Sequence, residues 1–231
     1  MSRSIIHSSL MYQAHISNEA KVVNALRQLE SLGLNKGTSG NVSLRSENGL
    51  LITPSGMAPA KMKSNDIVEL SMVGEVVGGG MPSSEWRFHR DIYAARSEIN
   101  AIVHMHSLAA TAFSTLRRDL PPFHYMIAVA GGDNVRCAAY ALFGTQLLSD
   151  LAINALENRK ACLLANHGMI STGKDMEEAI AIAVEIESLC AQYMLASQVG
   201  EPSILNSAQM VSVLEKFKTY GPQLKEKPDD N

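Results

Sequence analysis

The sequence lacks the features that mark disulfide-stabilised, membrane-spanning or secreted proteins. Its three cysteines form no Cys-x-x-Cys pair, so we expect neither a zinc ribbon nor a disulfide framework but buried free thiols in a reducing compartment. No uninterrupted apolar run approaches the ~20 residues of a transmembrane helix. The first residues contain no apolar core of the kind found in secretory signals. We therefore expect a cytoplasmic protein that has no membrane partner.

Excess charge of one sign is also missing. The 20 lysines and arginines nearly balance the 23 acidic residues, and the net charge of −3 argues against nucleic acid as a partner. Neither a Walker A motif nor a Gly-x-Gly-x-x-Gly fingerprint is present, so no nucleotide is indicated. What remains is an ordinary globular composition, and its 231 residues suit one large α/β domain.

Helical and strand patterns are mixed along the chain. Helices are predicted over 18–31, 108–116, 145–156, 175–196 and 207–219. A further helix is predicted to begin after residues 82–84, with Glu85 in its first turn. Strands are predicted over 42–44, 50–53, 67–70, 75–77, 101–106 and 162–165. This mixture predicts an α/β domain in which helices are layered on a sheet. We assign residues 1–17 to an N-terminal extension, 18–221 to the domain and 222–231 to a flexible tail.

His104 and His106 end the apolar run that begins at Ala101. Alternate side chains of a strand share one face, so both imidazoles point the same way and can supply half of a zinc site. His167 follows another apolar run, and Gly168 behind it allows a sharp turn. The alternative is that these are hydrogen-bonded core histidines, because a histidine on an apolar strand is often just that. Met105, between the pair, is expected in the core on the opposite face.

Glu85 also has two interpretations. As a carboxylate in the first turn of a helix it is favoured by the helix dipole and needs no chemical role. Beside a metal ion it can act as a ligand and as a proton acceptor.

Three small polar loops complete the set of functional candidates: 37–41, 53–56 and 82–84. Each offers backbone N–H groups and hydroxyl or amide donors, which bind phosphate without a cation. Each alone can be a plain turn or helix cap. Their combination with a metal site favours a phosphorylated ligand.

Taken in order, these residues resemble the class II aldolase/adducin family. The matching segments are 33–43, 51–56, 82–89, 103–106, 124–132, 166–168 and 215–221. The resemblance implies a three-layer α-β-α domain with a central, largely antiparallel sheet. It also implies a homotetramer with each active site at a subunit interface.

The family pattern assigns a role to each candidate. It implies one zinc ion per subunit on His104, His106 and His167, with Glu85 as the acid/base that also touches zinc at rest. Tyr125 is expected to donate a proton from a neighbouring subunit. The phosphate pocket is expected to comprise Gly40, Asn41, Ser55, Gly56, Ser83 and Ser84, and the aldehyde side or lid Phe143 and Tyr220.

The implied reaction is the reversible retro-aldol cleavage of a ketose 1-phosphate through a zinc-stabilised enediolate. We expect L-fuculose 1-phosphate as the substrate, giving dihydroxyacetone phosphate and L-lactaldehyde. Asn166 departs from the pattern, because relatives with this activity often carry a second histidine there.

Other members of the family remain as alternatives. Pentulose-phosphate 4-epimerases typically have Asp in place of Glu85 and a different segment over 124–132. Tetronate-phosphate decarboxylases share the zinc site and the Asn-His-Gly form of 166–168. A non-catalytic, adducin-like interaction domain would usually lack the histidine set.

Overall fold

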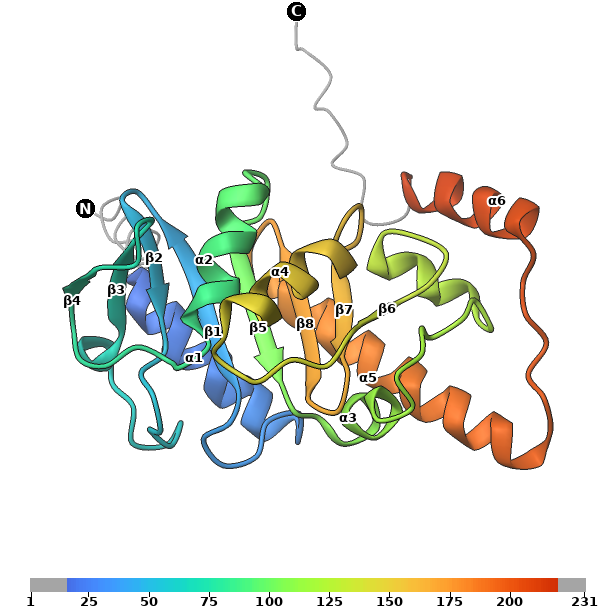
Figure 1. Cartoon of the computed structure of the whole chain (residues 1–231), viewed down its shortest axis with the longest axis horizontal. Coiled ribbons are helices and arrows are strands. Elements are labelled where there is room, and N and C mark those ends of the chain that lie inside the picture. The colour runs from blue at the N-terminus through green and yellow to red at the C-terminus, as the bar shows by residue number, and fades with distance from the viewer. Residues whose placement is uncertain (1–15, 220–231) are drawn as a thin grey trace, which may run out of the picture.

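One mixed sheet organises the computed structural model, which describes residues 16–219 (Figure 1). Its eight strands lie in the order β4-β3-β2-β1-β5-β8-β7-β6. All described neighbours pair antiparallel except β6 and β7, which are parallel. The strands are β1 (Asn41–Ser46), β2 (Gly49–Ile52), β3 (Val68–Ser71), β4 (Val76–Gly78), β5 (Ala101–Met105), β6 (Arg136–Ala138), β7 (Ala161–Leu164) and β8 (Gly168–Gly173).

Helices cover both faces of this sheet, which confirms the predicted three-layer, largely antiparallel domain. α2 and α4 lie on one face, and α1, α3 and α5 lie on the other (Figure 1). The helices are α1 (Asn18–Ser31), α2 (Trp86–Ala95), α3 (Leu108–Ser114), α4 (Gln146–Ala155), α5 (Met176–Val199) and α6 (Ser207–Phe217), with 3-10 helices η1 (Ser64–Asp66) and η2 (Tyr125–Ala130).

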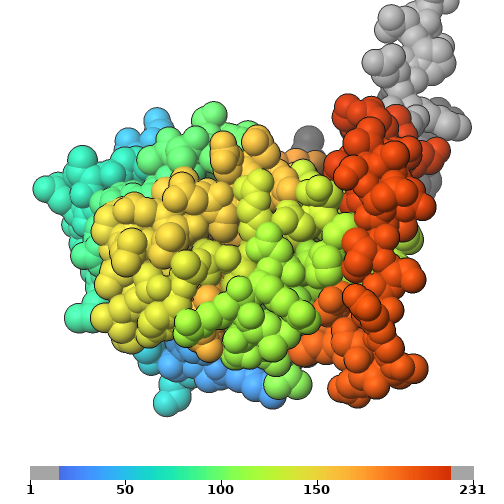
Figure 2. Space-filling view, turned by 45° about the vertical axis from the view of Figure 1, so that its right-hand side comes forward, coloured from blue at the N-terminus to red at the C-terminus, as the bar shows by residue number. Residues whose placement is uncertain are grey.

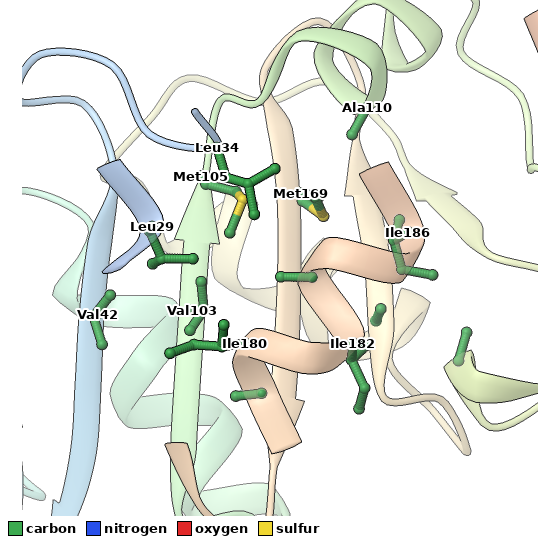
Figure 3. Packing of buried hydrophobic residues seen from close by; sticks show 14 of the residues in the cluster. Leu29, Leu34, Val42, Val103, Met105, Ala110, Met169, Ile180, Ile182 and Ile186 are labelled. Carbon is green, nitrogen blue, oxygen red and sulfur yellow. The ribbon is translucent and has the colours of Figure 1, made fainter. Parts of the chain in front are cut away.

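Alternation along the strands produces two separate cores. In β5, Val103 and Met105 pack with α1 and α5, next to Leu29 and Ile180 (Figure 3). Ile102 faces the α2 and α4 side instead. His104 follows the same alternation onto that second face, so Met105 is a core residue, as predicted.

Most predicted elements are present, and two local predictions are wrong. Glu85 is the N-cap residue of α2 and lies before its first turn, and its side chain makes no capping bond. Leu147, whose spacing with Leu148, Leu151 and Ala155 predicts one buried face over 145–156, is 59% exposed, because the helix turns Leu148 and Ala152 inward. Ser17, placed in the N-terminal extension, accepts a hydrogen bond from Ala20 N and caps α1. The rest of the extension up to residue 15, and the tail over 222–231, lie outside the described residues.

α5 is more apolar than the sequence led us to expect. Among the described residues it alone is long and apolar enough to cross a membrane, with a mean hydropathy of 1.5 over 18 residues. Our expectation that no uninterrupted apolar run would reach this length still holds, because Glu185 and Glu187 interrupt the apolar residues of α5. Ile182, Ile186 and Leu189 are buried on the face that packs against the sheet, so core packing accounts for the composition.

The last described helix, α6, lies at one edge of the molecule. α6, red in Figure 2, packs beside the η2 segment through the buried side chain of Met210. Its start is fixed by a capping box in which Asn206 and Gln209 exchange hydrogen bonds.

Candidate metal centre and substrate pocket

Four side chains from three parts of the chain converge beside the second core. His104 lies in β5, His106 one residue beyond its end, His167 directly before β8, and Glu85 at the start of α2. The antiparallel pairing of β5 with β8 sets His104 opposite Ile170, which brings His167 to the end of β5. One ligand atom from each residue lies within 4.8 Å of the other three.

The spacing of these ligand atoms fits a tetrahedral ion. His104 Nε2 is 3.0 Å from His106 Nε2 and 3.1 Å from Glu85 Oε2, and His167 Nε2 is 3.3 Å from Glu85 Oε1. Ligands about 2.1 Å from a zinc ion in a tetrahedron are separated by about 3.4 Å. Two imidazole nitrogens this close, with a carboxylate beside them, need a proton or a cation between them. The donor set therefore fits a divalent metal ion.

His104 is oriented for this role by the backbone. Its Nδ1 lies 2.9 Å from the carbonyl oxygen of Met169 and donates to it, because a carbonyl can only accept. This bond fixes the ring so that Nε2 points toward the centre. Histidine ligands are commonly fixed in this way by a partner on the second ring nitrogen.

Burial and mutual proximity set the charge states of the centre. Burial alone would raise the pKa of Glu85, but attraction and a hydrogen bond from His104, with smaller contributions from His167 and Asn41, lower it to about 2. Burial, and then the charge of His104, lower the pKa of His106 and of His167 to about 4. Near neutral pH the carboxylate is thus ionised, and these two imidazoles are neutral, as metal ligands must be.

A tight turn aims His167 inward. Asn166 adopts a left-handed conformation with φ of 55°, and its side chain accepts a 2.6 Å hydrogen bond from Arg117. A Cβ atom on Gly168 would lie 2.4 Å from the carbonyl oxygen of Met105 and 2.9 Å from His106 Cδ2. Only glycine allows β8 to pass this close to the end of β5.

Three residues of the centre, Glu85, His106 and His167, line a pocket with a volume of about 370 Å³. All three predicted anion-binding loops reach it, so the structure brings these segments together. No lysine or arginine is among the described residues that line the pocket, and neutral donors dominate its rim. The residues predicted for phosphate that line it are Gly40, Asn41, Ser55, Gly56, Ser83 and Ser84.

Two of these residues have their donors already engaged. The N–H of Gly40 donates to Asn35 Oδ1 over 3.1 Å. The amide of Asn41 donates to Glu85 Oε2 over 3.0 Å, and its oxygen is hydrogen bonded to His89. Ser55 and Gly56, by contrast, lie exposed at the rim, as does Ser84.

The remaining predicted residues divide into three cases. Phe143 lines the pocket together with Tyr140 and Ala141, on the loop between β6 and α4. Tyr125 begins η2, is 50% exposed and is absent from the pocket lining of this single chain. Tyr220 lies outside the described residues, so its role stays a prediction.

One buried residue near the site was missed from the sequence. His89 has no exposed surface and contacts Asn41 and Ser43, although no metal motif contains it. The available signal was its spacing, four residues after Glu85 on a helix that also buries Tyr93.

Comparison with known proteins agrees with this geometry. A family profile described as "Class II Aldolase and Adducin N-terminal domain" matches residues 20–194. The 5-methylthioribulose-1-phosphate/5-deoxyribulose-1-phosphate aldolase of Rhodospirillum rubrum is 54% identical over 200 residues, covering 87% of this chain and 90% of that protein.

L-fuculose phosphate aldolase of Escherichia coli K12 is 44% identical over 207 residues, covering 89% of this chain and 96% of that protein. A solved structure of L-fuculose 1-phosphate aldolase has a TM-score of 0.85 at 40% identity and covers 89% of this chain and 99% of its own. The chain therefore belongs to the class II aldolase/adducin family, within its metal-dependent aldolases, which are carbon–carbon lyases.

Proposed function

We propose that this aldolase uses zinc to cleave a short deoxyketose 1-phosphate between C3 and C4, reversibly, giving dihydroxyacetone phosphate and an aldehyde. The observation that carries the proposal is the cluster of Glu85, His104, His106 and His167, of which all but the buried His104 line a pocket shared with the three neutral loops. When bound, the ion would supply a Lewis acid that stabilises negative charge developing on the substrate oxygens.

The loops would hold the phosphate group. The hydroxyl and backbone groups of Ser55, Gly56, Ser83 and Ser84 face the same pocket as the histidines. Such neutral donors bind phosphate less tightly than a lysine or arginine would, which suits an enzyme that must release dihydroxyacetone phosphate. They also set the distance between the phosphate and the carbon at which the bond breaks.

Glu85 would move the proton at carbon. In cleavage, the electron pair of the C3–C4 bond stays with C3, and Glu85, after taking up a proton from solvent, would deliver it there to complete dihydroxyacetone phosphate. In condensation the ionised carboxylate removes that proton. Its lowered pKa, near 2, keeps the group ionised before dihydroxyacetone phosphate binds.

Tyr125 would exchange the proton of the C4 oxygen from a neighbouring subunit. Tyr125 is half exposed and is not among the residues that line the pocket of its own chain, which supports this arrangement and would require a homo-oligomer. We propose the homotetramer that the family pattern implies.

The identity of the sugar is a finer part of the proposal. We favour 5-deoxyribulose 1-phosphate or 5-methylthioribulose 1-phosphate over L-fuculose 1-phosphate, which was our expectation from the sequence. The 54% identity with the Rhodospirillum rubrum enzyme supports this choice. The wall formed by Tyr140, Ala141 and Phe143 supports it too, because the aldehydes released from the 5-deoxy and 5-methylthio substrates carry no hydroxyl, whereas L-lactaldehyde carries one.

A coupled assay for dihydroxyacetone phosphate tests the proposal. We expect chelator-sensitive release from all three 1-phosphates, restored by zinc, with a kcat/KM at least about tenfold higher for the 5-deoxypentulose substrates. L-ribulose 5-phosphate and a tetronate phosphate serve as probes for the epimerase and decarboxylase alternatives. Epimerisation or carbon dioxide release without dihydroxyacetone phosphate would refute an aldolase function, and purified protein without bound metal would favour an adducin-like role.

A further inference from the structure

A line of buried polar groups runs from the interior of the domain to Glu85. Tyr93 Oη lies 2.9 Å from Ser43 Oγ, which lies 2.7 Å from His89 Nδ1. His89 Nε2 is hydrogen bonded to Asn41 Oδ1, and Asn41 Nδ2 donates to Glu85 Oε2 over 3.0 Å. His89 and Ser43 have no exposed surface, and Tyr93, Asn41 and Glu85 are at most 4% exposed.

The line forms because the spacing of polar residues along α2 matches their spacing along β1. Glu85, His89 and Tyr93 are four residues apart along α2, an interval of about 6 Å in a helix. Asn41 and Ser43 are two residues apart on β1, an interval of about 6.6 Å in a strand. The two intervals are nearly equal, so each strand side chain bridges two successive polar groups of the helix.

The carboxylate fixes the direction of every hydrogen bond in the line. An ionised carboxylate only accepts, so Asn41 must turn its NH₂ toward Glu85 and its oxygen toward His89. That oxygen also only accepts, so His89 must carry its proton on Nε2. Burial, and then the charge of His104, lower the pKa of His89 to about 3, so the ring is neutral and its Nδ1 accepts from Ser43.

The two oxygens of Glu85 consequently have different surroundings. Oε2 accepts from Asn41 and lies beside His104. Oε1 is buried with no hydrogen-bond partner among the described residues, and it lies 3.3 Å from His167 Nε2. One oxygen is tethered, and the other is left for chemistry.

We propose that His89 is a positioning residue for Glu85: its ring holds the Asn41 amide in the orientation that tethers Oε2 and leaves Oε1 to move the proton. The inference deepens the proposed function and rests on it. Asn41 is then an orienting group for the base, although it also borders the phosphate loops. The ring of His89 touches neither substrate nor metal and acts only through Asn41.

The direct test is hydrogen exchange between D₂O and the hydroxymethyl carbon of dihydroxyacetone phosphate, which needs the base but no aldehyde. We expect His89→Leu to lower the rate constant about 10- to 100-fold, while bound zinc and the KM for dihydroxyacetone phosphate change little. His89→Gln, which keeps an N–H donor, should recover much of the rate. Asn41→Ala should likewise lower the rate constant rather than raise the KM.

Ser171→Ala is the matched control, because it removes a buried hydrogen bond, from Ser171 Oγ to the Ala179 carbonyl, on the other face of the sheet. It should exchange at the wild-type rate. Wild-type exchange in folded His89→Leu would overturn the inference, as would a raised KM at an unchanged rate constant in Asn41→Ala. If His89→Leu does not fold, Asn41→Ala and His89→Gln decide by the same criteria.

A second readout does not depend on activity. ¹⁵N NMR of histidine-labelled protein should show His89 as the neutral Nε2–H tautomer, and the Nδ1–H tautomer would overturn the inference. Failure of the proposed function would look different: wild-type protein would neither exchange nor release dihydroxyacetone phosphate, whatever the tautomer of His89.

Discussion

At the scale of single residues, Glu85 is held in a position that its local sequence does not require. It occupies the N-cap position of α2, where a short polar side chain would ordinarily accept from the helix backbone. Its carboxylate turns instead into the histidine cluster. The attraction of that cluster outweighs burial and lowers the pKa of Glu85 to about 2. Glu85 therefore does not stabilise the start of α2 as a cap, and its side chain is part of the histidine cluster instead.

Glu85→Gln tests this role. The amide cannot take a proton, so we expect turnover to fall at least about 100-fold, in line with general acid–base contributions. The three histidines should still bind zinc, which metal analysis of the purified variant checks. Glu98→Gln is the matched control, because that carboxylate is exposed and pairs only with Arg96 in the described structure. Near-normal release of dihydroxyacetone phosphate by Glu85→Gln would remove Glu85 from the mechanism.

Gly168→Ala tests the close approach of β8 to β5. The new Cβ would meet the Met105 carbonyl at 2.4 Å and the His106 ring at 2.9 Å. We expect a loss of about 1–3 kcal/mol in the free energy of unfolding, from forced displacement in a packed site. Zinc affinity, measured by chelator competition, should fall as His106 shifts. Gly78→Ala, where the added atom meets nothing within 4 Å, should change neither quantity, and equal effects in both variants would contradict this account.

The sequence predicts the site residues where the signal is local. Alternation in a strand placed His104 and His106 on one face, and Gly168 indicated the turn beside His167. The position of His167 depends on the pairing of β5 with β8, which joins residues about sixty apart, and no local pattern fixes it. His89 was missed because its partners Asn41 and Ser43 belong to another strand.

At the scale of elements, α5 stabilises the segment that follows His106. Glu187 of α5 accepts from Ser107 Oγ at 2.6 Å and from the N–H groups of Ala109 and Ala110 at 2.7 and 2.8 Å. These N–H groups open α3, and a carboxylate there satisfies donors that the helix itself leaves free. The capping group comes from about eighty residues further along the chain. It therefore ties the loop after His106 to the helix that spans the opposite face.

Glu187→Ala should lower the free energy of unfolding by about 2 kcal/mol, since hydrogen bonds to a charged group are lost and buried donors are left unpaired. Denaturant unfolding of the metal-free protein measures this. Glu185→Ala, on the same helix, should change stability by less than about 0.5 kcal/mol. If the two variants unfold alike, Glu187 does not stabilise α3.

Asp91 joins α2 to α4 and should make their contact sensitive to acid. Burial would raise its pKa, but hydrogen bonds from Arg90, Ser149 and Gln146 lower it below 3.8. Because the folded pKa is the lower one, this stabilisation is present above the unfolded value of 3.8 and is lost as pH falls through the folded pKa.

Asp91→Asn should therefore be less stable than the wild type by about 1 kcal/mol at pH 7. The difference should shrink as pH falls below 3.8, the unfolded value. Urea unfolding at several pH values measures it. A difference that does not depend on pH would show that the charge of Asp91 contributes nothing.

At the scale of the whole molecule, apolar side chains remain exposed beside the pocket of the described chain. Phe143 lines the pocket, Leu142 precedes it, and both are more than half exposed, while Tyr125 is half exposed and does not line the pocket. Apolar surface at a pocket mouth is commonly covered by another chain. The layers of the domain follow from periodicity, whereas sequence periodicity gives no signal for the surfaces through which subunits would associate.

Mixing two inactive variants tests whether the site is shared. Glu85→Gln and Tyr125→Phe should each lose most activity alone. If Tyr125 serves the neighbouring Glu85, co-assembled subunits in equal amounts regain about a quarter of the wild-type sites, because each site draws one residue from each chain. Mixing of the separately folded proteins without subunit exchange is the control. No recovery on co-refolding would place both residues in one subunit's site.

The pocket wall formed by Tyr140, Ala141 and Phe143 belongs to a loop that contributes no ligand to the metal cluster. The carbonyl of Gly144 anchors this loop by accepting a 2.7 Å hydrogen bond from Arg87. The side chains of Tyr140 and Phe143 are exposed and belong to neither hydrophobic core. Tyr140 is still linked to the metal cluster, because Arg117 lies 5.8 Å from its ring and also donates to Asn166 beside His167. Phe143 has no hydrogen bond or ring contact to the cluster among the described residues, so it is the position at which the pocket wall can be changed with the least disturbance of the histidines.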